Sequence, residues 1–121
     1  TLFLLEGVSM YLSKYEVETI LGVCSTNRVP GSSIIFDFTF PEVIDGSSEF
    51  PVAAIWRQKA AEGGEPLTFG INNEDLQKLL SRNGFCNVQI VDHSYLNEKY
   101  FISLGDSRKS TPLLSIASAT L

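Results

Sequence analysis

The strongest constraint on the fold of this chain is the apolar run at its start, Thr1-Leu2-Phe3-Leu4-Leu5, in which only the first residue is polar. A short continuous apolar run of this kind favours a strand that is buried on both faces, as in a parallel sheet. Glu6 and Gly7 follow where the run stops. Because ligands of open α/β sheets bind beyond the carboxyl ends of the strands, Glu6 is a candidate for a functional site. A solvated glutamate in a turn is the alternative, and position alone favours neither.

The composition is that of one small globular domain and argues against several classes of partner. The chain has 121 residues, 44% of them hydrophobic and 19% charged, with a net charge of −5. Its basic residues are scattered, so no nucleic-acid partner is expected, and no apolar run is long enough to predict a membrane span. Cys24 and Cys86 lack metal-ligand spacing and are predicted to be reduced core thiols of a cytoplasmic protein that binds no metal.

The first residue lies inside a strand pattern, with no initiator Met, polar lead-in or helix cap before it. A strand buried on both faces needs neighbours on both sides, and the rest of the chain offers few. The sequence therefore predicts that residues 1–121 are the C-terminal part of a longer domain whose N-terminal part is absent.

A helix is expected after the first strand. Ser13 and Glu16 have the spacing of a capping box, in which the hydroxyl accepts from a first-turn amide and the glutamate reaches back. The positions that follow carry an apolar stripe on one helix face, formed by Val17, Ile20, Leu21 and Cys24. The predicted helix runs from about Lys14 to Ser25, and a loop over residues 27–32 follows it.

Residues 33–39, Ser-Ile-Ile-Phe-Asp-Phe-Thr, are predicted to form a second buried strand. Together with the first strand and the helix it makes a βαβ unit, whose right-handed crossover places the two strands parallel. Asp37 interrupts the apolar pattern near the end of this strand. A carboxylate there could contact a ligand or satisfy loop amides, and the second role is favoured.

The middle of the chain is predicted to contain a long loop and a second helix. Residues 40–50 are expected to be irregular, and Pro51 suits the first turn of a helix over residues 51–62. The core face of this helix is expected to consist of Val52, Ile55 and Trp56. Trp56 and Arg57 also lie beside the expected ligand edge, although core packing of Trp56 and a solvated charge on Arg57 are the favoured roles.

The next segment is predicted to be extended over residues 67–71 and then helical. Asn72 or Asn73 caps the helix, which runs to about Asn83, and Gly84 suits the left-handed position that ends it. The core side of this region is expected to consist of Leu76, Leu79, Leu80 and Phe85.

The C-terminal region is predicted to form two strands, over residues 87–92 and 113–121. Because no helix connects them, they should pair antiparallel. Residues 105–112 look like a polar loop, and residues 96–104 either extend the first of these strands or pair locally. His93 has no partner at ligand spacing and is expected to be structural. The predicted fold is therefore α/β, a partial parallel sheet with helices and a C-terminal antiparallel strand pair.

Three blocks of sequence, in this order, resemble the leucine carboxyl methyltransferase family, a branch of the S-adenosylmethionine-dependent O-methyltransferases. The blocks are Glu6-Gly7-Val8-x-Met10-Tyr11-Leu12, Gly64-Glu65-Pro66-x-x-Phe69-Gly70-Ile71 and Leu79-Leu80-x-x-x-Gly84-Phe85. The resemblance covers residues 1–92, and its weight lies in the order of the blocks. It implies the C-terminal half of a Rossmann-like class I methyltransferase fold, from its fourth strand onward, with S-adenosylmethionine as the cofactor.

The resemblance also implies roles for particular residues. Glu6 and Gly7 would lie near the methionyl end of the cofactor, and Tyr11 would line the methyl-transfer pocket. The acceptor side would be formed by Tyr11 together with Trp56, Arg57 and Phe69. The glycine-rich loop and the acid that bind most of the cofactor match nothing here, so the isolated chain is expected to bind cofactor poorly and to be inactive. Transfer of an activated methyl group requires mainly alignment and exclusion of water, so no catalytic residue is singled out.

The resemblance leaves the methyl acceptor open. Members of the family are expected to methylate C-terminal carboxylates of proteins, or hydroxyls and carboxyls of small natural products such as polyketides. A small-molecule acceptor is favoured, because a net charge of −5 does not attract an acidic protein tail.

Two other functions fit the sequence pattern. One is a non-catalytic interaction domain that pairs with another chain through an exposed sheet edge. The other is a different α/β enzyme, such as an oxidoreductase, whose nucleotide-binding half is absent. The residues upstream of Thr1 would separate these hypotheses.

Overall fold

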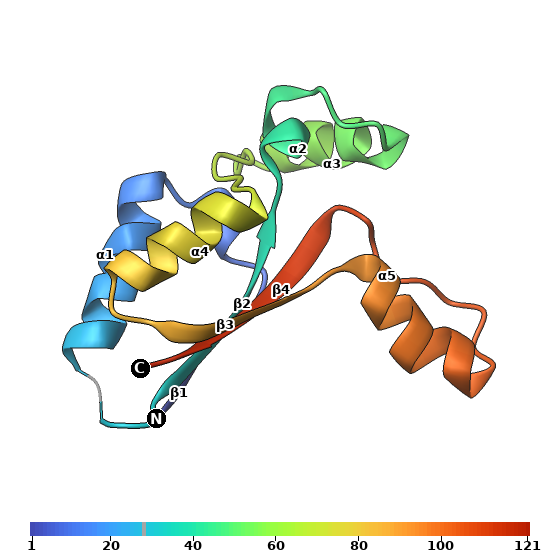
Figure 1. The fold of residues 1–121 in the computed structure, drawn as a ribbon. Helices are drawn as coiled ribbons and strands as arrows, with labels where there is room; N and C mark the ends of the chain where they lie inside the picture. Colours follow the sequence, from blue (N-terminus) through green and yellow to red (C-terminus); the bar gives the residue numbers. More distant parts are fainter. Residues whose placement is uncertain (28) are drawn as a thin grey trace.

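The computed structural model of the chain describes residues 1–27 and 29–121. Its centre is a four-stranded sheet with the strand order β1-β2-β4-β3 (Figure 1). The strands are β1 (Leu2–Leu5), β2 (Ser33–Thr39), β3 (Cys86–Val91) and β4 (Leu114–Thr120). β1 and β2 are parallel, and β4 is antiparallel to both of its neighbours. The predicted α/β class, the parallel pair and the C-terminal antiparallel pair are confirmed.

The helices have clear start signals in the sequence. They are α1 (Lys14–Thr26), α2 (Pro41–Asp45), α3 (Pro51–Glu62), α4 (Asn73–Arg82) and α5 (His93–Leu96), with a 3₁₀ turn at Ser9–Tyr11. The capping box of α1 is confirmed, because Ser13 Oγ accepts from the Glu16 N–H at 3.2 Å and the Ser13 N–H donates to the Glu16 carboxylate at 2.7 Å. The loop predicted over 27–32 includes residue 28, which lies outside the described residues.

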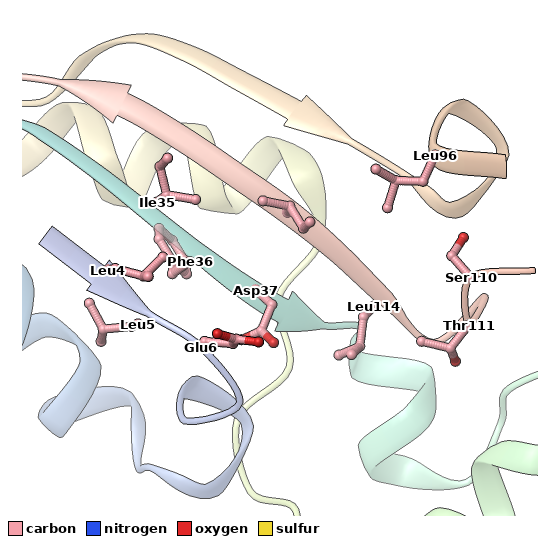
Figure 2. A pocket seen from close by; sticks show the side chains of 11 residues that line it. Leu4, Leu5, Glu6, Ile35, Phe36, Asp37, Leu96, Ser110, Thr111 and Leu114 are labelled. Atoms are coloured by element: carbon pink, nitrogen blue, oxygen red, sulfur yellow. The ribbon is translucent and has the colours of Figure 1, made fainter. Parts of the chain in front are cut away.

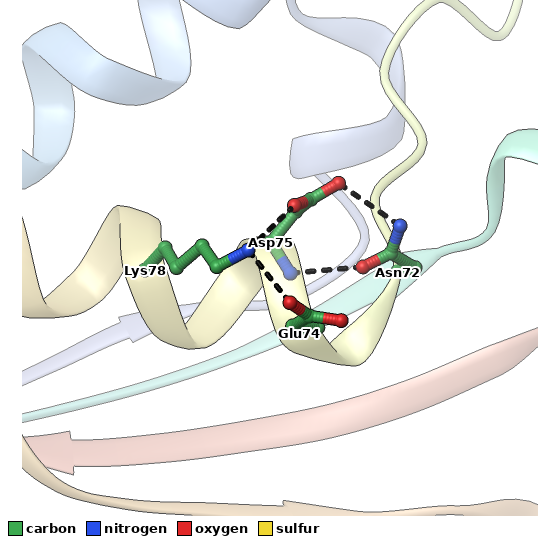
Figure 3. A network of polar contacts seen from close by, with 4 residues as sticks. All are labelled: Asn72, Glu74, Asp75 and Lys78. Carbon is green, nitrogen blue, oxygen red and sulfur yellow. Dashed lines mark hydrogen bonds and ion pairs between the residues drawn. The ribbon is translucent and has the colours of Figure 1, made fainter.

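The cap of α4 is also confirmed. Asn72 Oδ1 accepts from the Asp75 N–H at 2.8 Å, and Lys78 pairs with the carboxylates of Glu74 and Asp75 on the first turns (Figure 3). At the other end of α4, Gly84 has a φ of 86°, the left-handed conformation that favours glycine.

α1 and α4 lie on the same face of the sheet and bury the main core (Figure 1). Phe38, Leu76 and Leu80 are completely buried in this core. The ion pair of Glu18 with Arg82 joins the two helices at the surface. A second cluster lies between the 3₁₀ turn, α2, α3 and the start of β4, and contains Met10, Val43, Ala53, Leu67 and Leu113. None of the helices in the described part of the chain has the length and apolarity that crossing a bilayer requires.

The prediction that the first strand is buried on both faces is wrong for this chain. Leu2 is 61% exposed and Leu4 is 63% exposed. The reason is that α1 and α4 pack on the face that carries the alternate residues, Phe3 and Leu5. On the face of the sheet opposite α1 and α4, β1 therefore exposes the aliphatic side chains of Leu2 and Leu4 to solvent.

Two further predictions are corrected in the middle of the chain. Residues 40–50 are not irregular throughout, because Pro41 begins the short helix α2. The predicted core face of α3 is also wrong in part, since Val52 is 46% and Ile55 54% exposed. α3 packs instead through Ala53, with Trp56 and Ala60 half-buried against the second cluster. The helix therefore contacts the protein through two alanines and one tryptophan, and not through Val52 and Ile55.

Residues 96–104 neither extend the strand before them nor pair locally, which were the two alternatives expected from the sequence; together with residues 93–95 they form a helical arm. α5 continues as a π-helical turn over Asn97–Phe101 and a 3₁₀ turn over Ile102–Leu104, and the arm projects away from the sheet (Figure 1). Of the two cysteines, Cys24 is buried as predicted, and burial raises the pKa of its thiol. Cys86 is exposed, because it lies on the edge strand β3, so its assignment to the core is wrong.

Gly70 provides a test of how the extended segment 65–72 packs on the protein. A Cβ atom at Gly70 would lie 2.6 Å from the carbonyl oxygen of Phe40 and 2.8 Å from Ile44 Cγ1. We expect Gly70→Ala to lower the free energy of unfolding by about 1–3 kcal/mol through overpacking. The matched control is Gly22→Ala in α1, where no atom lies within 4 Å, and this change should stabilise the protein by up to about 1 kcal/mol. Urea denaturation measures both, and equal effects of the two changes would contradict the close approach at Gly70.

Candidate functional site

The carboxyl ends of three strands meet at one edge of the sheet. β1 runs parallel to β2, and β4 runs antiparallel to both β2 and β3, so β1, β2 and β3 all point the same way. Polar residues follow or end these strands at that edge: Glu6 after β1, Asp37 near the end of β2 and Asp92 after β3. Because α/β sheets bind ligands at this edge, the functional site is expected there.

A hollow of about 310 Å³ lies at this edge, on the face of the sheet that α1 and α4 leave open (Figure 2). Its floor is aliphatic and consists of Leu4 from β1, Ile35 from β2 and Ile116 from β4. The carboxylates of Glu6 and Asp37 lie next to each other at its end (Figure 2). The hollow therefore combines an apolar surface with two acidic groups, the usual pattern of a small-molecule site.

The carboxylates of Asp37 and Glu6 have different structural roles. Both oxygens of Asp37 accept from the Gly7 N–H, at 3.0 Å each, and the backbone carbonyl of Asp37 accepts from Ser9 Oγ at 2.6 Å. Asp37 thereby holds the turn that follows β1, which confirms the role that the sequence favours for it. Glu6 is exposed and has no hydrogen-bond partner among the residues that the structure describes. Its carboxylate remains available to a ligand.

Burial raises the pKa of Asp37, against the lowering effect of the hydrogen bond from Gly7, and the negative charge of Glu6 adds to the rise. The folded state therefore binds this proton more tightly than the unfolded state. The contribution of Asp37 to the free energy of unfolding is fully present below pH 3.8, the ordinary pKa of an aspartate. It is lost as the pH rises from 3.8 through the raised pKa of the folded state.

Replacing Asp37 with asparagine tests this linkage. The amide keeps a carbonyl acceptor for the Gly7 N–H and cannot ionise. We expect the free energy of unfolding of Asp37→Asn, relative to the wild type, to increase as the pH rises from about 3 to about 7. Urea denaturation across this range measures it, and a difference independent of pH would mean that Asp37 has the same pKa in both states.

The predicted cofactor residues Glu6 and Gly7 lie together at this edge, with Gly7 in the left-handed conformation at a φ of 66°. Tyr11 ends the 3₁₀ turn and packs half-buried against the second cluster, as Trp56 also does. Trp56 lines a shallow apolar hollow that shares Thr111 and Leu114 with the hollow beside Glu6. The structure therefore places Trp56 next to the Glu6 site, although it does not line that site.

The other two predicted residues, Arg57 and Phe69, do not line the hollow beside Glu6. The Arg57 guanidinium lies against Gly46, and its charge contributes to a lowered pKa of Asp45, whose main cause is hydrogen bonding from Ser47. Phe69 is buried in the main core, where it is 4% exposed.

Sequence reasoning misses the residues that the C-terminal region contributes to the hollow. These are Leu96 from α5, Ser110 and Thr111 from the following loop, and Leu114 and Ile116 from β4. They reach the site because β4 inserts beside β2, a long-range pairing that leaves no local signal. The alternation of apolar residues in β4 is the one feature that could have indicated them. Within the described residues, no group of three or more His, Cys, Asp or Glu side chains is arranged to hold a metal ion.

No family model matches the chain. In sequence, YktD of Bacillus subtilis (strain 168), whose name assigns it to the S-adenosyl-L-methionine-dependent methyltransferases, is 24% identical over 107 residues, which are 88% of this chain and 35% of YktD. Among solved structures, a Nostoc punctiforme protein named as an O-methyltransferase aligns with a TM-score of 0.60 and 16% identity, over 99% of this chain and 31% of its own. Human N-acetylserotonin methyltransferase, solved with its cofactor, aligns with a TM-score of 0.58 and 15% identity, over 98% of this chain and 28% of its own.

These alignments cover almost all of the chain but only about a third of each relative. The similarity extends over all four strands, including the antiparallel strand β4 between β2 and β3. The chain has the α/β fold of the class I S-adenosylmethionine-dependent methyltransferases.

Proposed function

We propose that the protein to which this chain belongs is an S-adenosylmethionine-dependent methyltransferase, and that Glu6 helps to bind its cofactor. The observation that carries the proposal is an exposed carboxylate, with no hydrogen-bond partner among the described residues, at the carboxyl edge of a sheet with the methyltransferase fold. The sequence relative and the structural neighbours named above support the same reaction.

The residues present fit one part of this cofactor. S-adenosylmethionine supplies a methyl group already activated on a sulfonium, so the protein must mainly bind, align and exclude water. A carboxylate such as Glu6 can accept charge-assisted hydrogen bonds from the cofactor's ammonium group. Gly7 leaves the backbone open to close approach, and Asp37 fixes the position of Gly7. The chain contains no glycine-rich loop for the adenosyl part, which fits a cofactor site completed by residues outside it.

The reaction that we propose is methyl transfer to an oxygen, either a carboxylate or a hydroxyl of a small molecule. The resemblance of the three sequence blocks to the leucine carboxyl methyltransferases supports oxygen as the acceptor atom. The O-methyltransferase of Nostoc punctiforme among the structural neighbours also supports it. The apolar floor of the hollow favours a small organic acceptor over a charged protein tail, with Tyr11 and Trp56 on the acceptor side.

The open face of the sheet supports the proposal that the chain is the C-terminal part of a larger domain. Leu2 and Leu4 are more than half exposed; Leu4 is part of the aliphatic floor of the hollow, and Leu2 lies two residues before it on the same strand. A soluble domain normally covers such a surface. Helices of an N-terminal cofactor-binding half, packed on this face, would bury both leucines and enclose the cofactor beside Glu6.

Comparison of the full-length protein with the isolated 121-residue chain tests this function. Calorimetric titration with S-adenosylmethionine should show binding by the full-length protein and at least about a hundredfold weaker binding by the isolated chain, verified as folded by circular dichroism. Transfer of labelled methyl groups from the cofactor to small carboxylic acids and phenols should occur only with the full-length protein. Low-micromolar binding by the isolated chain would show that the cofactor site is misplaced. A full-length protein that neither binds the cofactor nor transfers methyl groups would end the proposal.

A second function, an interaction domain, has one observation in its favour. β1 is an edge strand, and the side chains of Leu2 and Leu4 are exposed beside it. Such an edge can add a strand from another chain. A stable complex of the full-length protein with a second chain, lost when Leu4 is replaced by lysine, would favour this function over methyl transfer.

A further inference from the structure

A second and larger pocket, of about 490 Å³, lies at the same edge of the sheet but on the opposite face from the Glu6 hollow. Its walls come from α2, the loop between α2 and α3, and the turn after β3. Ser115 of β4 lines it, and we call it the Ser115 pocket. Ser115 is paired with Phe38 in the sheet register and therefore points to the face that α1 and α4 cover. The volume is in the range of sites that bind small molecules.

Ser115 is the first indication that this pocket receives a ligand. Its side chain is 99% buried, with 1% relative exposure, yet its hydroxyl has no hydrogen-bond partner among the described residues. The buried hydroxyls nearby are satisfied: Thr39 Oγ1 donates to the Leu113 carbonyl at 2.7 Å, and Ser9 Oγ donates to the Asp37 carbonyl at 2.6 Å. A buried hydroxyl without a partner is costly, so the exception at Ser115 points to a group that enters the pocket.

The charge of the pocket indicates what that group is. Glu42, Glu49 and Asp92 line it, and no lysine or arginine does so within the described residues. Asp92 also accepts from the Tyr95 N–H at 2.9 Å, which fixes its carboxylate as the cap of α5. Arg57, on α3, lies against the turn at Gly46 and is not among the residues that line the pocket. The pocket is therefore acidic and attracts a cation.

Aromatic side chains give the pocket an apolar wall. The rings of Phe50 and His93 pack edge to face, with centroids 6.2 Å apart and an angle of 80°. Both residues line the pocket. A positive charge near the face of an aromatic ring is attracted by its quadrupole, and an apolar group is buried against the same surface. The expected ligand therefore carries both a cation and an apolar body.

We propose that the Ser115 pocket binds a small organic ammonium compound with an apolar or aromatic body. Its N–H groups would donate to Ser115 Oγ and to the carboxylates of Glu42 and Glu49, while its body would lie against Phe50. This site goes beyond the proposed function, because it lies on the other face of the sheet from Glu6 and its occupancy requires no methyl transfer.

The test uses the full-length protein and three probes of similar shape and different charge: 2-phenylethylamine, 2-phenylethanol and 3-phenylpropanoate. We expect two-dimensional NMR titrations at neutral pH to show saturable binding of the amine, at least about tenfold tighter than that of the alcohol, and no binding of the acid. The shifts should centre on the backbone amides of Phe50, His93 and Ser115. Equal binding of amine and alcohol, or shifts centred on Glu6 instead, would overturn the proposal.

Two variants and one control assign the contacts. Ser115→Ala should lower the affinity for 2-phenylethylamine about tenfold, with little loss of stability because the hydroxyl has no partner to lose. Glu49→Gln, on the surface, should lower it severalfold and reduce its dependence on salt. Glu98→Gln, on the exposed arm, is the matched control and should leave the affinity unchanged. If Ser115→Ala and Glu49→Gln both bind the amine as the wild type does, the proposal is wrong.

Discussion

Replacing Glu6 with glutamine is expected to weaken the binding of S-adenosylmethionine to the full-length protein by about tenfold to a hundredfold. A hydrogen bond between a carboxylate and an ammonium contributes about 1.5–3 kcal/mol, and this substitution removes the charge while it keeps the shape. Folding should not change, because the Glu6 side chain has no partner among the described residues and the neighbouring turn is held by Asp37. Calorimetry measures the affinity, and the melting temperature reports the fold.

The matched control for this change is Glu98→Gln, which removes the same charge from the exposed arm. It should leave both quantities unchanged. If Glu6→Gln lowers the melting temperature and leaves the affinity as it was, Glu6 supports the turn after β1 and has no part in the site. Unchanged affinity in a stably folded Glu6→Gln protein likewise removes Glu6 from the site.

Phe38→Ala is expected to lower the free energy of unfolding by about 3–5 kcal/mol. The Phe38 side chain is 0% exposed and lies on β2 between the rings of its neighbours, with centroids 6.3 Å from Phe36 and 5.8 Å from Phe40. Its removal leaves a cavity between the sheet and the helices that cannot collapse, because β2 is paired on both sides. Since natural domains have unfolding free energies of about 5–15 kcal/mol, the variant should be close to unfolded at physiological temperature.

Urea denaturation of the variant and the wild type gives this difference directly. Tyr15→Ala is the control, because Tyr15 is 77% exposed on α1 and its loss should cost little. A decrease below about 1 kcal/mol for Phe38→Ala would mean that the face of the sheet under α1 and α4 is loosely packed.

Local signals in the sequence predict most of the individual elements. Capping residues and periodic apolar positions place α1 and α4 to within a residue or two, and the bounds predicted for β2 and α3 agree with the structure. These signals are reliable because each depends on neighbours only a few residues away. The turn at Gly84 is predictable for the same reason, since its left-handed backbone favours glycine.

The features that the sequence does not predict depend on contacts between distant segments. Val52 and Ile55 are exposed because the other side of α3 packs against the second cluster. The spacing of apolar residues along α3 does not indicate which side packs. The helical arm that begins at His93 is also missed, because its mixture of aromatic and polar residues matches neither the helical nor the strand period of apolar residues.

The same reasoning applies to the candidate site. Glu6 and Gly7 are predictable because a carboxylate and a glycine end an apolar run, the local signature of a strand end. The residues from the loop before β4 are not predictable, because they reach the hollow through the pairing of β2 with β4. The Ser115 pocket is missed for a further reason, since a serine in an alternating strand resembles any surface-facing position.

The position of β4 also determines the order in which this chain can fold. β4 is the last of the four strands along the sequence, yet it pairs with both β2 and β3. Ser33, the first residue of β2, is paired with Thr120, the last residue of β4. β1, α1 and β2 can form a unit from local contacts, whereas β3 stands at the end of the sheet and joins it only through β4. Pairings between distant segments must overcome loop-closure entropy before they gain contacts, which slows folding. During synthesis, the βαβ unit of β1, α1 and β2 therefore keeps the outer edge of β2 unpaired until residues 114–120 emerge, and β3 and β4 then complete the sheet together.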